Sequence, residues 1–278
     1  MEKMCSILNV SRSGFYKWLQ ERHKVNSYQK RRNALLARIS WLFFDAKCRY
    51  GSPKITRLLR REGWSVSERL VGSIMQENGL RACVSKRFRV TTTDSNHDNP
   101  IAPNVLNQQF KTIAPNKVWV TDITYIPCRE GRLYLASVLD LYTRKIVGWK
   151  LSDRMTTDLV LGALEHAYTS HNPAKGLLHH SDRGSQYTSE DYRKKLEEYG
   201  MEASMSRRGN CYDNACIESF HSVLKKEFIY CTKFRTKQQA QQEVFEYIEL
   251  FYNRKRIHGS LGYISPIQFE DLYYKNIS

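Results

Sequence analysis

An aspartate stands in the middle of an apolar segment that predicts a β-strand. The segment is VWVTDITYIP, residues 118–127, and the aspartate is Asp122. Its β-branched and aromatic residues favour the interior of a sheet. A carboxylate in that position is costly unless a cationic group pairs with it. The fold of this chain must therefore provide a cationic partner at this point of the sheet.

Strand-like and helical segments follow one another from residue 118 onward. Short turns at Glu130-Gly131 and Thr143-Arg144 predict that the first strands pair antiparallel. Helices lead into the last two strands, which favours parallel pairing. The predicted strands span residues 118–127, 132–142, 145–152, 176–182 and 201–206, and the helices between the later strands span residues 156–170 and 189–200. The sequence therefore predicts an α/β domain with a mixed five-stranded sheet flanked by helices.

Two further carboxylates have positions that suit a metal site. Asp182 ends the fourth predicted strand, where the chain leaves the sheet and a ligand crevice belongs. Glu218 lies 36 positions later on a predicted helix. The polar residues on the same helix face are His221, Ser222 and Lys225. Carboxylates from a strand centre, a strand end and a helix can converge on a pair of hard cations such as Mg²⁺, which prefers oxygen ligands.

Positive charge is concentrated in the N-terminal third of the chain. The sequence has 44 Lys and Arg against 28 Asp and Glu, which gives a formal net charge of +16. Residues 1–100 carry +12 of this charge and residues 101–278 carry +4. Such a field attracts nucleic acid, because binding releases the counterions condensed on the phosphates. We therefore expect nucleic-acid binding in the N-terminal third.

Two short helical patterns in that third outline a helix-turn-helix. A break at Gly63 and Trp64 separates them. Ser65 and Glu68 fit a capping box that opens the second helix, and Gly79 fits its end. The second helix would then enter a DNA major groove. The candidate DNA contacts on or beside these helices are Lys54, Arg57, Arg60, Arg61 and Arg69.

A polar segment with three prolines, residues 91–116, divides the chain. It shows no sustained hydrophobic period, which is typical of a linker. The expected parts are a helical leader over residues 1–25, a helix-turn-helix-like DNA-binding domain over 26–90, a linker over 91–110, and a sheet-containing core with a C-terminal helix over 111–278. Ser11 is the expected helix cap in the leader.

The sequence shows neither a membrane span nor a signal peptide, so we expect a cytoplasmic protein without a membrane partner. Seven cysteines are scattered at positions 5, 48, 83, 128, 211, 216 and 231. Their odd number and spacing fit neither a disulfide framework nor a zinc knuckle. We therefore expect reduced thiols.

Four blocks of the sequence resemble the OrfB-type transposases of two-frame bacterial insertion sequences. The blocks are WVTDITYI, HSDRGSQYTS, SRRGNCYDNACIESFHSVLKKE and YNRKRIHGSLGYISPIQF. The resemblance extends over nearly the whole chain, including the basic helix-turn-helix region and the leader VSRSGFYKWL. The catalytic core of that family is similar to retroviral integrase and ribonuclease H. The resemblance therefore implies a ribonuclease H-like DDE core.

The resemblance also implies that Asp122, Asp182 and Glu218 are the catalytic and metal-binding triad. Two Mg²⁺ ions, for which Mn²⁺ can substitute, would clamp the attacking and leaving oxygens of a phosphoryl displacement. Asp122 would bridge the two ions, and the other two carboxylates would each complete the coordination of one. Water would first cut at the end of the element, and the freed 3′-hydroxyl would then attack another strand.

Lys225 matches a basic position of the family, whereas His221 departs from the family pattern and is not counted as a metal ligand. Lys225 resembles the basic residue that holds DNA near the metals, and His221 stands where the family suggests an aromatic residue. His180 shares a strand face with Asp182 and would either orient that carboxylate or pack in the core. The further candidate DNA contacts are Arg207, Arg208 and Arg256. The implied partners are double-stranded DNA at the element ends and at the target, further copies of this chain, and the upstream-frame protein of the same element.

Two other classes of protein remain open. A metal-dependent nuclease of the ribonuclease H-like fold would share the three carboxylates but would need no helix-turn-helix. A DNA-binding regulator derived from a silent transposase would keep the N-terminal part but should lose a carboxylate. The basic N-terminal third and the complete triad favour the transposase.

Overall fold

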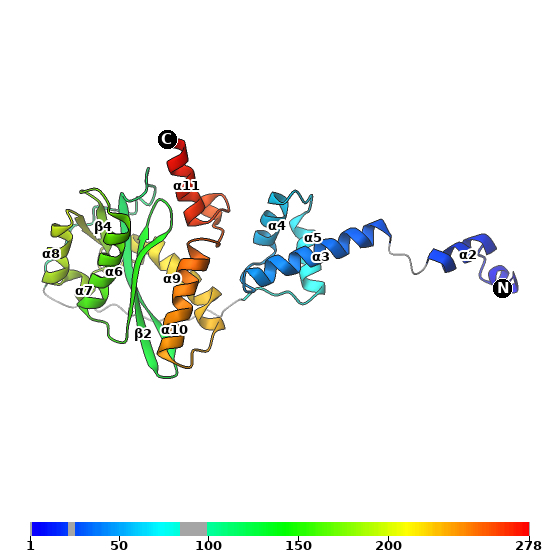
Figure 1. Ribbon diagram of the computed structural model, residues 1–278, viewed down its shortest axis with the longest axis horizontal. Coiled ribbons are helices and arrows are strands. Elements are labelled where there is room, and N and C mark those ends of the chain that lie inside the picture. The colour runs from blue at the N-terminus through cyan, green and yellow to red at the C-terminus, as the bar shows by residue number, and fades with distance from the viewer. Residues whose placement is uncertain (1, 22–25, 84–98, 278) are drawn as a thin grey trace. The chain divides into compact units, whose positions relative to one another are not determined.

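The computed structural model describes residues 2–21, 26–83 and 99–277. The chain divides into two compact units, Met1–Ala82 and Cys83–Ser278, each of which is described by itself (Figure 1). Among the described residues no helix is both long and apolar enough to cross a membrane.

The first unit is entirely helical. Its helices are α1 (Glu2–Ile7), α2 (Arg12–Glu21), α3 (Ser27–Asp45), α4 (Ser52–Arg61) and α5 (Glu68–Glu77). Helices α3, α4 and α5 pack around a small core formed by Leu35, Ile39, Leu42, Phe43, Ile55, Leu59, Val71, Ile74 and Met75. In the leader, the Gly14 N–H donates to Ser11 Oγ at 3.0 Å, which confirms Ser11 as the cap of α2.

The helix-turn-helix has the predicted turn but a different cap. Gly63, which follows α4, and Gly79, which follows α5, have φ values of +87° and +67°. Both glycines therefore adopt a backbone conformation that favours glycine. Ser67, not Ser65, caps α5, because its Oγ accepts from the Leu70 N–H at 3.2 Å. Arg31 on α3 donates to the carbonyl of Ser65 at 2.9 Å and holds that residue in the turn. Residues 84–90, the predicted end of this domain, lie outside the described residues.

The second unit contains the predicted sheet. Its strands are β1 (Val118–Cys128), β2 (Gly131–Asp140), β3 (Ile146–Ser152), β4 (Leu178–Ser181) and β5 (Glu202–Met205), in the order β3-β2-β1-β4-β5. The first three strands pair antiparallel, and β4 and β5 continue the sheet in parallel with β1. This arrangement confirms the mixed five-stranded sheet.

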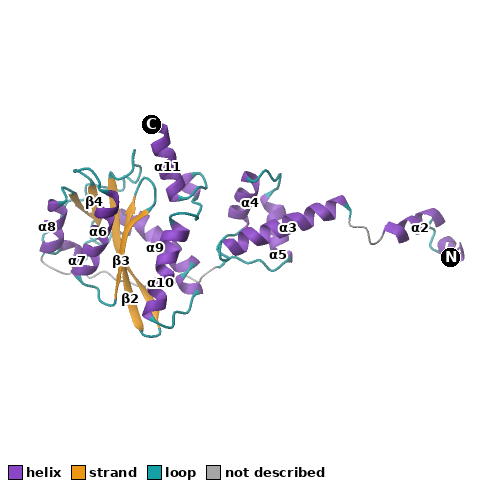
Figure 2. Ribbon diagram, in the orientation of Figure 1, coloured by secondary structure: helices purple, strands orange, loops and turns teal. Residues whose placement is uncertain are grey.

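Helices cover both faces of the sheet (Figures 1 and 2). One face carries α6 (Thr157–His171), α7 (Ser185–Thr188) and α8 (Glu190–Glu198), and the other carries α9 (Ala215–Glu227) and α10 (Lys237–Phe245). Trp119 and Ile123 belong to the apolar cluster under α6. Because side chains alternate along a strand, Asp122 lies on the opposite face, toward α9.

Part of the expected linker belongs to the core. The Val105 and Leu106 N–H groups donate to Ser204 Oγ on β5 at 3.0 and 3.2 Å, and Leu106 is buried. Asn104 and Gln108 donate to Asp213 at 2.9 and 2.8 Å. The core therefore includes residues 99–110, ahead of the expected start at residue 111, while residues 91–98 lie outside the described residues.

The C-terminal segment is tied to the core by buried polar contacts. It comprises the π-helix η3 (Glu246–Tyr252), the short 3-10 helix η4 (Gly259–Leu261) and α11 (Pro266–Ile277). Two further 3-10 helices, η1 (Cys211–Asn214) and η2 (Ile229–Cys231), lie earlier in the chain, on either side of α9. Asn253 exchanges two hydrogen bonds of 3.0 Å with the backbone of Ile146. Arg256 is buried and donates through Nε and Nη2 to both carboxylate oxygens of Glu227 at 2.8 Å. This burial gives Arg256 a structural role, against the expected contact with DNA phosphates.

A disulfide joins Cys83 to Cys231. This bond corrects the expectation that all the cysteines are reduced thiols. Spacing along the sequence could not reveal it, because the two residues are 148 positions apart. The free cysteines among the described residues are Cys5, Cys48, Cys128 and Cys216.

We expect a fragment with residues 99–278 to be markedly more stable than one with residues 111–278. The shorter fragment loses the burial of Leu106 and two hydrogen bonds to the carboxylate of Asp213. Together these contacts are worth roughly 3 kcal/mol or more. Urea unfolding followed by circular dichroism measures the difference, and equal midpoints for the two fragments would show that residues 99–110 are a true linker.

The second prediction concerns the buried ion pair. We expect Glu227→Gln to lower the free energy of unfolding by about 3 to 5 kcal/mol, because it leaves the buried Arg256 without a compensating charge. The double variant E227L/R256M removes both charges and should recover most of that loss. Denaturant unfolding of both variants checks this, and a loss in the double variant as large as in the single one would contradict it.

Candidate active site

Asp122 lies at the centre of β1 with both carboxylate oxygens in contact with the protein. Its Oδ1 accepts from the Ile123 N–H at 2.8 Å, and its Oδ2 lies 3.3 Å from Nδ1 of His221 on α9. Asp122 pairs across the sheet with Ser137 on β2. The side chain keeps 20% of its surface exposed, so a ligand can still reach it.

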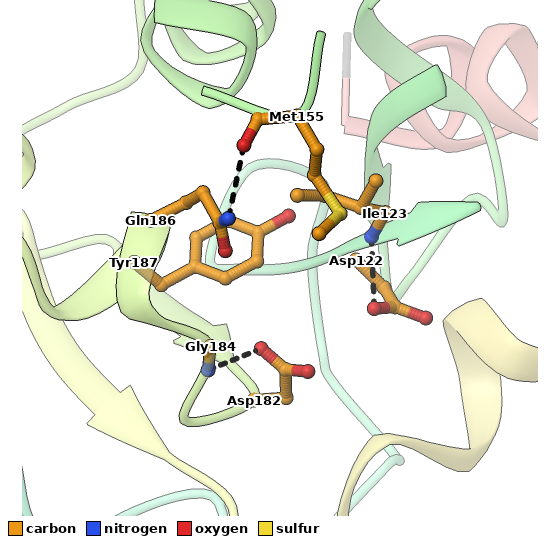
Figure 3. Close-up of a pocket in the computed structure, with 7 residues that line it drawn as sticks. All are labelled: Asp122, Ile123, Met155, Asp182, Gly184, Gln186 and Tyr187. Carbon is orange, nitrogen blue, oxygen red and sulfur yellow. Dashed lines mark hydrogen bonds between the residues drawn. The ribbon is translucent and has the colours of Figure 1, made fainter. Parts of the chain in front are cut away.

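Asp182 follows β4 and lies level with Asp122. The register between the parallel strands pairs Val120 with His180, so two more residues on each strand bring the two aspartates side by side. Asp182 Oδ1 accepts from the Gly184 N–H at 2.9 Å, which fixes the exit turn after the strand. Both aspartates line one pocket, whose walls are Asp122, Ile123, Met155, Asp182, Gly184, Gln186 and Tyr187 (Figure 3).

Glu218 on α9 approaches the two aspartates. Its pKa is raised, first by burial and then by the negative charges of Asp122 and Asp182. The N-terminus of α9 is held against β1, because Asn214 Nδ2 donates to the Thr121 carbonyl at 3.0 Å. Glu218 therefore lies close enough to both aspartates for their charges to act on it, and a divalent cation relieves such repulsion.

The carboxylates do not already form a closed cluster. Within the described ranges, no three His, Cys, Asp or Glu side chains lie at the spacing of a preformed metal site. The donor set of Asp122, Asp182 and Glu218 is nevertheless made of carboxylate oxygens, which Mg²⁺ prefers as ligands. The residues present therefore fit divalent cations.

The sequence analysis did not single out the pocket residues Met155, Gln186 and Tyr187. Tyr187 is fully buried, and its hydroxyl lies 3.2 Å from Thr121 Oγ1. Burial raises the pKa of Tyr187 well above its ordinary value, and the charges of both aspartates add to the shift. Gln186 donates to the carbonyl of Met155 at 3.1 Å. Gln186 and Tyr187 lie in the block HSDRGSQYTS, so that block could have indicated them, whereas nothing in the sequence marks Met155.

Lys225 reaches the same region from the next turns of α9. Its Nζ lies 4.9 Å from the ring centroid of Tyr125 on β1, within the range of a cation–π contact. Burial lowers the pKa of Lys225, and the negative charge of Asp122 opposes that effect. The structure therefore brings Lys225 toward Asp122.

The loop before α9 is organised by Asp213. This carboxylate is buried, and it accepts from Nε and Nη2 of Arg207 at 3.0 and 2.7 Å as well as from the Arg207 N–H at 2.8 Å. Hydrogen bonds from Arg207 hold the pKa of Asp213 far below its usual range, against the opposing effect of burial. Arg207 thus fixes the loop with its guanidinium while half of its side chain stays exposed, and the neighbouring Arg208 is exposed.

His180 packs in the core beside the site. Its ring nitrogens lie 2.9 Å from Ser204 Oγ and 3.1 Å from Ser206 Oγ. Burial lowers the pKa of His180 to about 4, so the ring is neutral at physiological pH. These contacts support the packing role rather than the orientation of Asp182.

The basic residues expected on the helix-turn-helix differ in exposure. Lys54 is half-buried, and its Nζ lies 4.6 Å from the ring centroid of Tyr50. Arg60 donates to the carbonyl of Val66 at 3.0 Å. The exposed members of the set are Arg57, Arg60, Arg61 and Arg69. These four arginines therefore remain accessible to a partner.

Three family models match the chain. Two are described as an integrase core domain and match residues 113–211 and 218–272, and the third is described as an HTH-like domain and matches residues 30–88. Among solved structures, the chain is similar to the simian T-cell lymphotropic virus intasome in complex with a PP2A regulatory subunit. That likeness has a TM-score of 0.48 and 13% sequence identity, and it covers 84% of this chain and 74% of the other.

Two curated relatives cover nearly the full length of this chain. The insertion element IS600 uncharacterized 31 kDa protein of Shigella sonnei is 43% identical over 272 residues, which cover 98% of this chain and 99% of the relative. The transposase InsF for insertion sequence IS3A of Escherichia coli strain K12 is 40% identical over 271 residues, which cover 98% and 94%. This chain therefore belongs to the family of bacterial insertion-sequence transposases that carry an integrase core domain.

Proposed function

We propose that this protein is the DDE transposase of a bacterial insertion sequence. It cleaves the ends of the element with water as the nucleophile, and it joins the freed 3′-hydroxyls to other DNA by phosphoryl transfer. The observation that carries the proposal is that Asp122 and Asp182 line one pocket, with Glu218 near enough that their charges add to the effect of burial in raising its pKa. Family membership supplies the substrate class.

The carboxylates of Asp122, Asp182 and Glu218 would hold two divalent cations, Mg²⁺ or Mn²⁺. Such ions would supply the positive charge that stabilises the attacking and leaving oxygens of an in-line displacement. The protein contributes the fixed geometry: the Ile123 N–H orients Asp122, the Gly184 N–H orients Asp182, and the helix α9 carries Glu218.

Lys225 would bind the DNA backbone next to the reacting phosphate. Its partial burial against Tyr125 limits the rotation of the side chain, so a phosphate contact there costs less conformational entropy than at a fully exposed lysine. Arg207 and Arg208 on the loop before α9 would contact the backbone farther along the strand. These contacts position DNA and carry no sequence information.

The helix-turn-helix would grip the ends of the element. Helix α5 would enter the major groove. Arg69 of α5 and the arginines of α4 would contact the flanking phosphates. The proposed contacts are Lys54, Arg57, Arg60, Arg61 and Arg69. A second copy of this chain would hold the other end of the element, because both ends must be processed together. The upstream-frame protein of the element is a further proposed partner.

Two observations disfavour the alternative functions. A silent DNA-binding regulator would have no need for the three carboxylates, whereas all three are present in the sequence and two of them line one pocket. A simple nuclease would have no need for the basic helical unit that precedes the core. Each alternative predicts a different outcome in the two experiments that follow.

We expect Asp182→Asn and Glu218→Gln to abolish Mg²⁺-dependent cleavage and strand transfer on a DNA duplex that carries the element end. The cleavage rate should fall by more than roughly 100-fold, because a change in a residue that only hydrogen-bonds to a metal ligand can already cost that much. DNA affinity without metal should stay near that of the unchanged protein, because the basic surface is intact. Glu190→Gln on α8 removes an exposed carboxylate paired with Lys194 and serves as the control, with normal activity. Near-normal cleavage by either triad variant would rule out the assignment.

Arg69→Ala tests the DNA-binding role of α5. If Arg69 neutralises a phosphate, the variant should bind duplex DNA more weakly, and the slope of log K against log salt should become shallower by about 0.9. Lys194→Ala, on the surface of α8, is the matched control and should leave the slope unchanged. Fluorescence anisotropy at a series of salt concentrations measures both. An unchanged slope together with unchanged affinity would remove α5 from the DNA interface.

A further inference from the structure

His221 is a buried histidine with both ring nitrogens in contact with polar groups. Only 5% of the residue is exposed. Its Nε2 lies 2.7 Å from Ser137 Oγ on β2, and its Nδ1 lies 3.3 Å from Asp122 Oδ2 on β1. Because Asp122 and Ser137 are partners across the two strands, one ring on α9 spans both of them. Sequence reasoning did not include His221 in the site.

The partners of the ring fix its tautomer. An ionised carboxylate can only accept a hydrogen bond, so the nitrogen that faces Asp122 must carry a proton. In the neutral ring, Nε2 then accepts from the hydroxyl of Ser137, which is itself completely buried. The ring therefore lies between the Ser137 hydroxyl, at 2.7 Å, and the carboxylate of Asp122, at 3.3 Å.

Among the described residues, His221 is the side chain that faces the second oxygen of Asp122. The Ile123 N–H holds Oδ1, while His221 faces Oδ2. With one donor on each oxygen, the carboxylate cannot rotate about its last bond without losing a contact. The outer lone pairs are then left for a cation. Partners that orient a metal ligand in this way strengthen metal binding.

We propose that His221, held by Ser137, is a positioning residue that sets the carboxylate of Asp122 for divalent cations. The inference rests on the proposed metal site, and it goes beyond that site because it assigns a role to a residue outside the triad. A phenylalanine at position 221 would fill a similar volume but would give Asp122 no donor and would leave the Ser137 hydroxyl without its nitrogen partner. An asparagine would keep an N–H donor close to the place of Nδ1.

The test is a titration of the full-length protein with Mn²⁺, in which electron paramagnetic resonance measures free Mn²⁺. We expect His221→Phe and Ser137→Ala to weaken Mn²⁺ binding, His221→Phe by about 10- to 100-fold. His221→Asn should recover part of the affinity lost in His221→Phe. Competition with Mg²⁺ should give the same order of variants. Asp182→Asn provides the reference for loss of the metal site itself.

His179→Phe is the matched control for a general loss of stability. His179 is also buried, and its Nε2 lies 3.2 Å from the Tyr192 hydroxyl, away from the carboxylates. This variant should melt at a lower temperature without metal but should bind Mn²⁺ like the unchanged protein. Unchanged Mn²⁺ affinity in His221→Phe would overturn the inference while leaving the triad intact, and so would an equal loss in His179→Phe. Absence of Mn²⁺ binding in the unchanged protein would overturn the proposed metal site and this inference together.

Discussion

Mutual repulsion among carboxylates is the constraint around which the second unit is built. Asp122 and Asp182 line the same pocket, the first from β1 and the second from just past the neighbouring parallel strand β4. Glu218 lies on α9, near enough for the charges of both aspartates to act on it. Burial raises the pKa of Glu218, and the negative charges of Asp122 and Asp182 raise it further. Without a cation the arrangement costs stability, so the rest of the unit must hold the three groups in place by other means.

Hydrogen bonds to the backbone and to buried polar groups do this. Asn214 joins the start of α9 to β1 directly beside Asp122. The carboxylate of Asp213, one residue earlier, accepts hydrogen bonds from Arg207 in the same loop and from Asn104 and Gln108. These bonds resist opening, because in a poorly solvated interior a broken hydrogen bond leaves a costly unpaired group. The segment that looked like a linker is therefore part of the scaffold of the site.

Local patterns predicted the parts of the structure that depend on local physics. Alternation of side chains and short turns predicted the five strands and their pairing. The proposed site carboxylates Asp182 and Glu218 were chosen from their positions at a strand end and on a helix. The failures concern residues whose role depends on distant partners. Arg256 looked like a phosphate contact because a sequence does not show that Glu227 neutralises it in the core. The sequence pointed to Ser65 as the cap of α5, but Ser67 caps the helix and Arg31 donates to the carbonyl of Ser65. The disulfide and the docking of Leu106 join segments far apart in sequence, for which composition carries no signal.

Both ends of α9 are anchored, so the C-terminal segment helps to hold the helix that carries Glu218 in the proposed site. Asn214 fixes the N-terminal end of the helix to β1, and Glu227, its last residue, is held by the buried Arg256. Arg256 in turn belongs to a segment that Asn253 ties to β3. A helix held at one end can pivot, and a pivot displaces a side chain near its middle. Fixing the second end removes that motion, so Glu218 and His221 keep their distance from Asp122. The basic block YNRKRIHGSLGYISPIQF therefore carries a buried positive charge that steadies the helix, and positive charge in that block is not by itself a sign of contact with DNA.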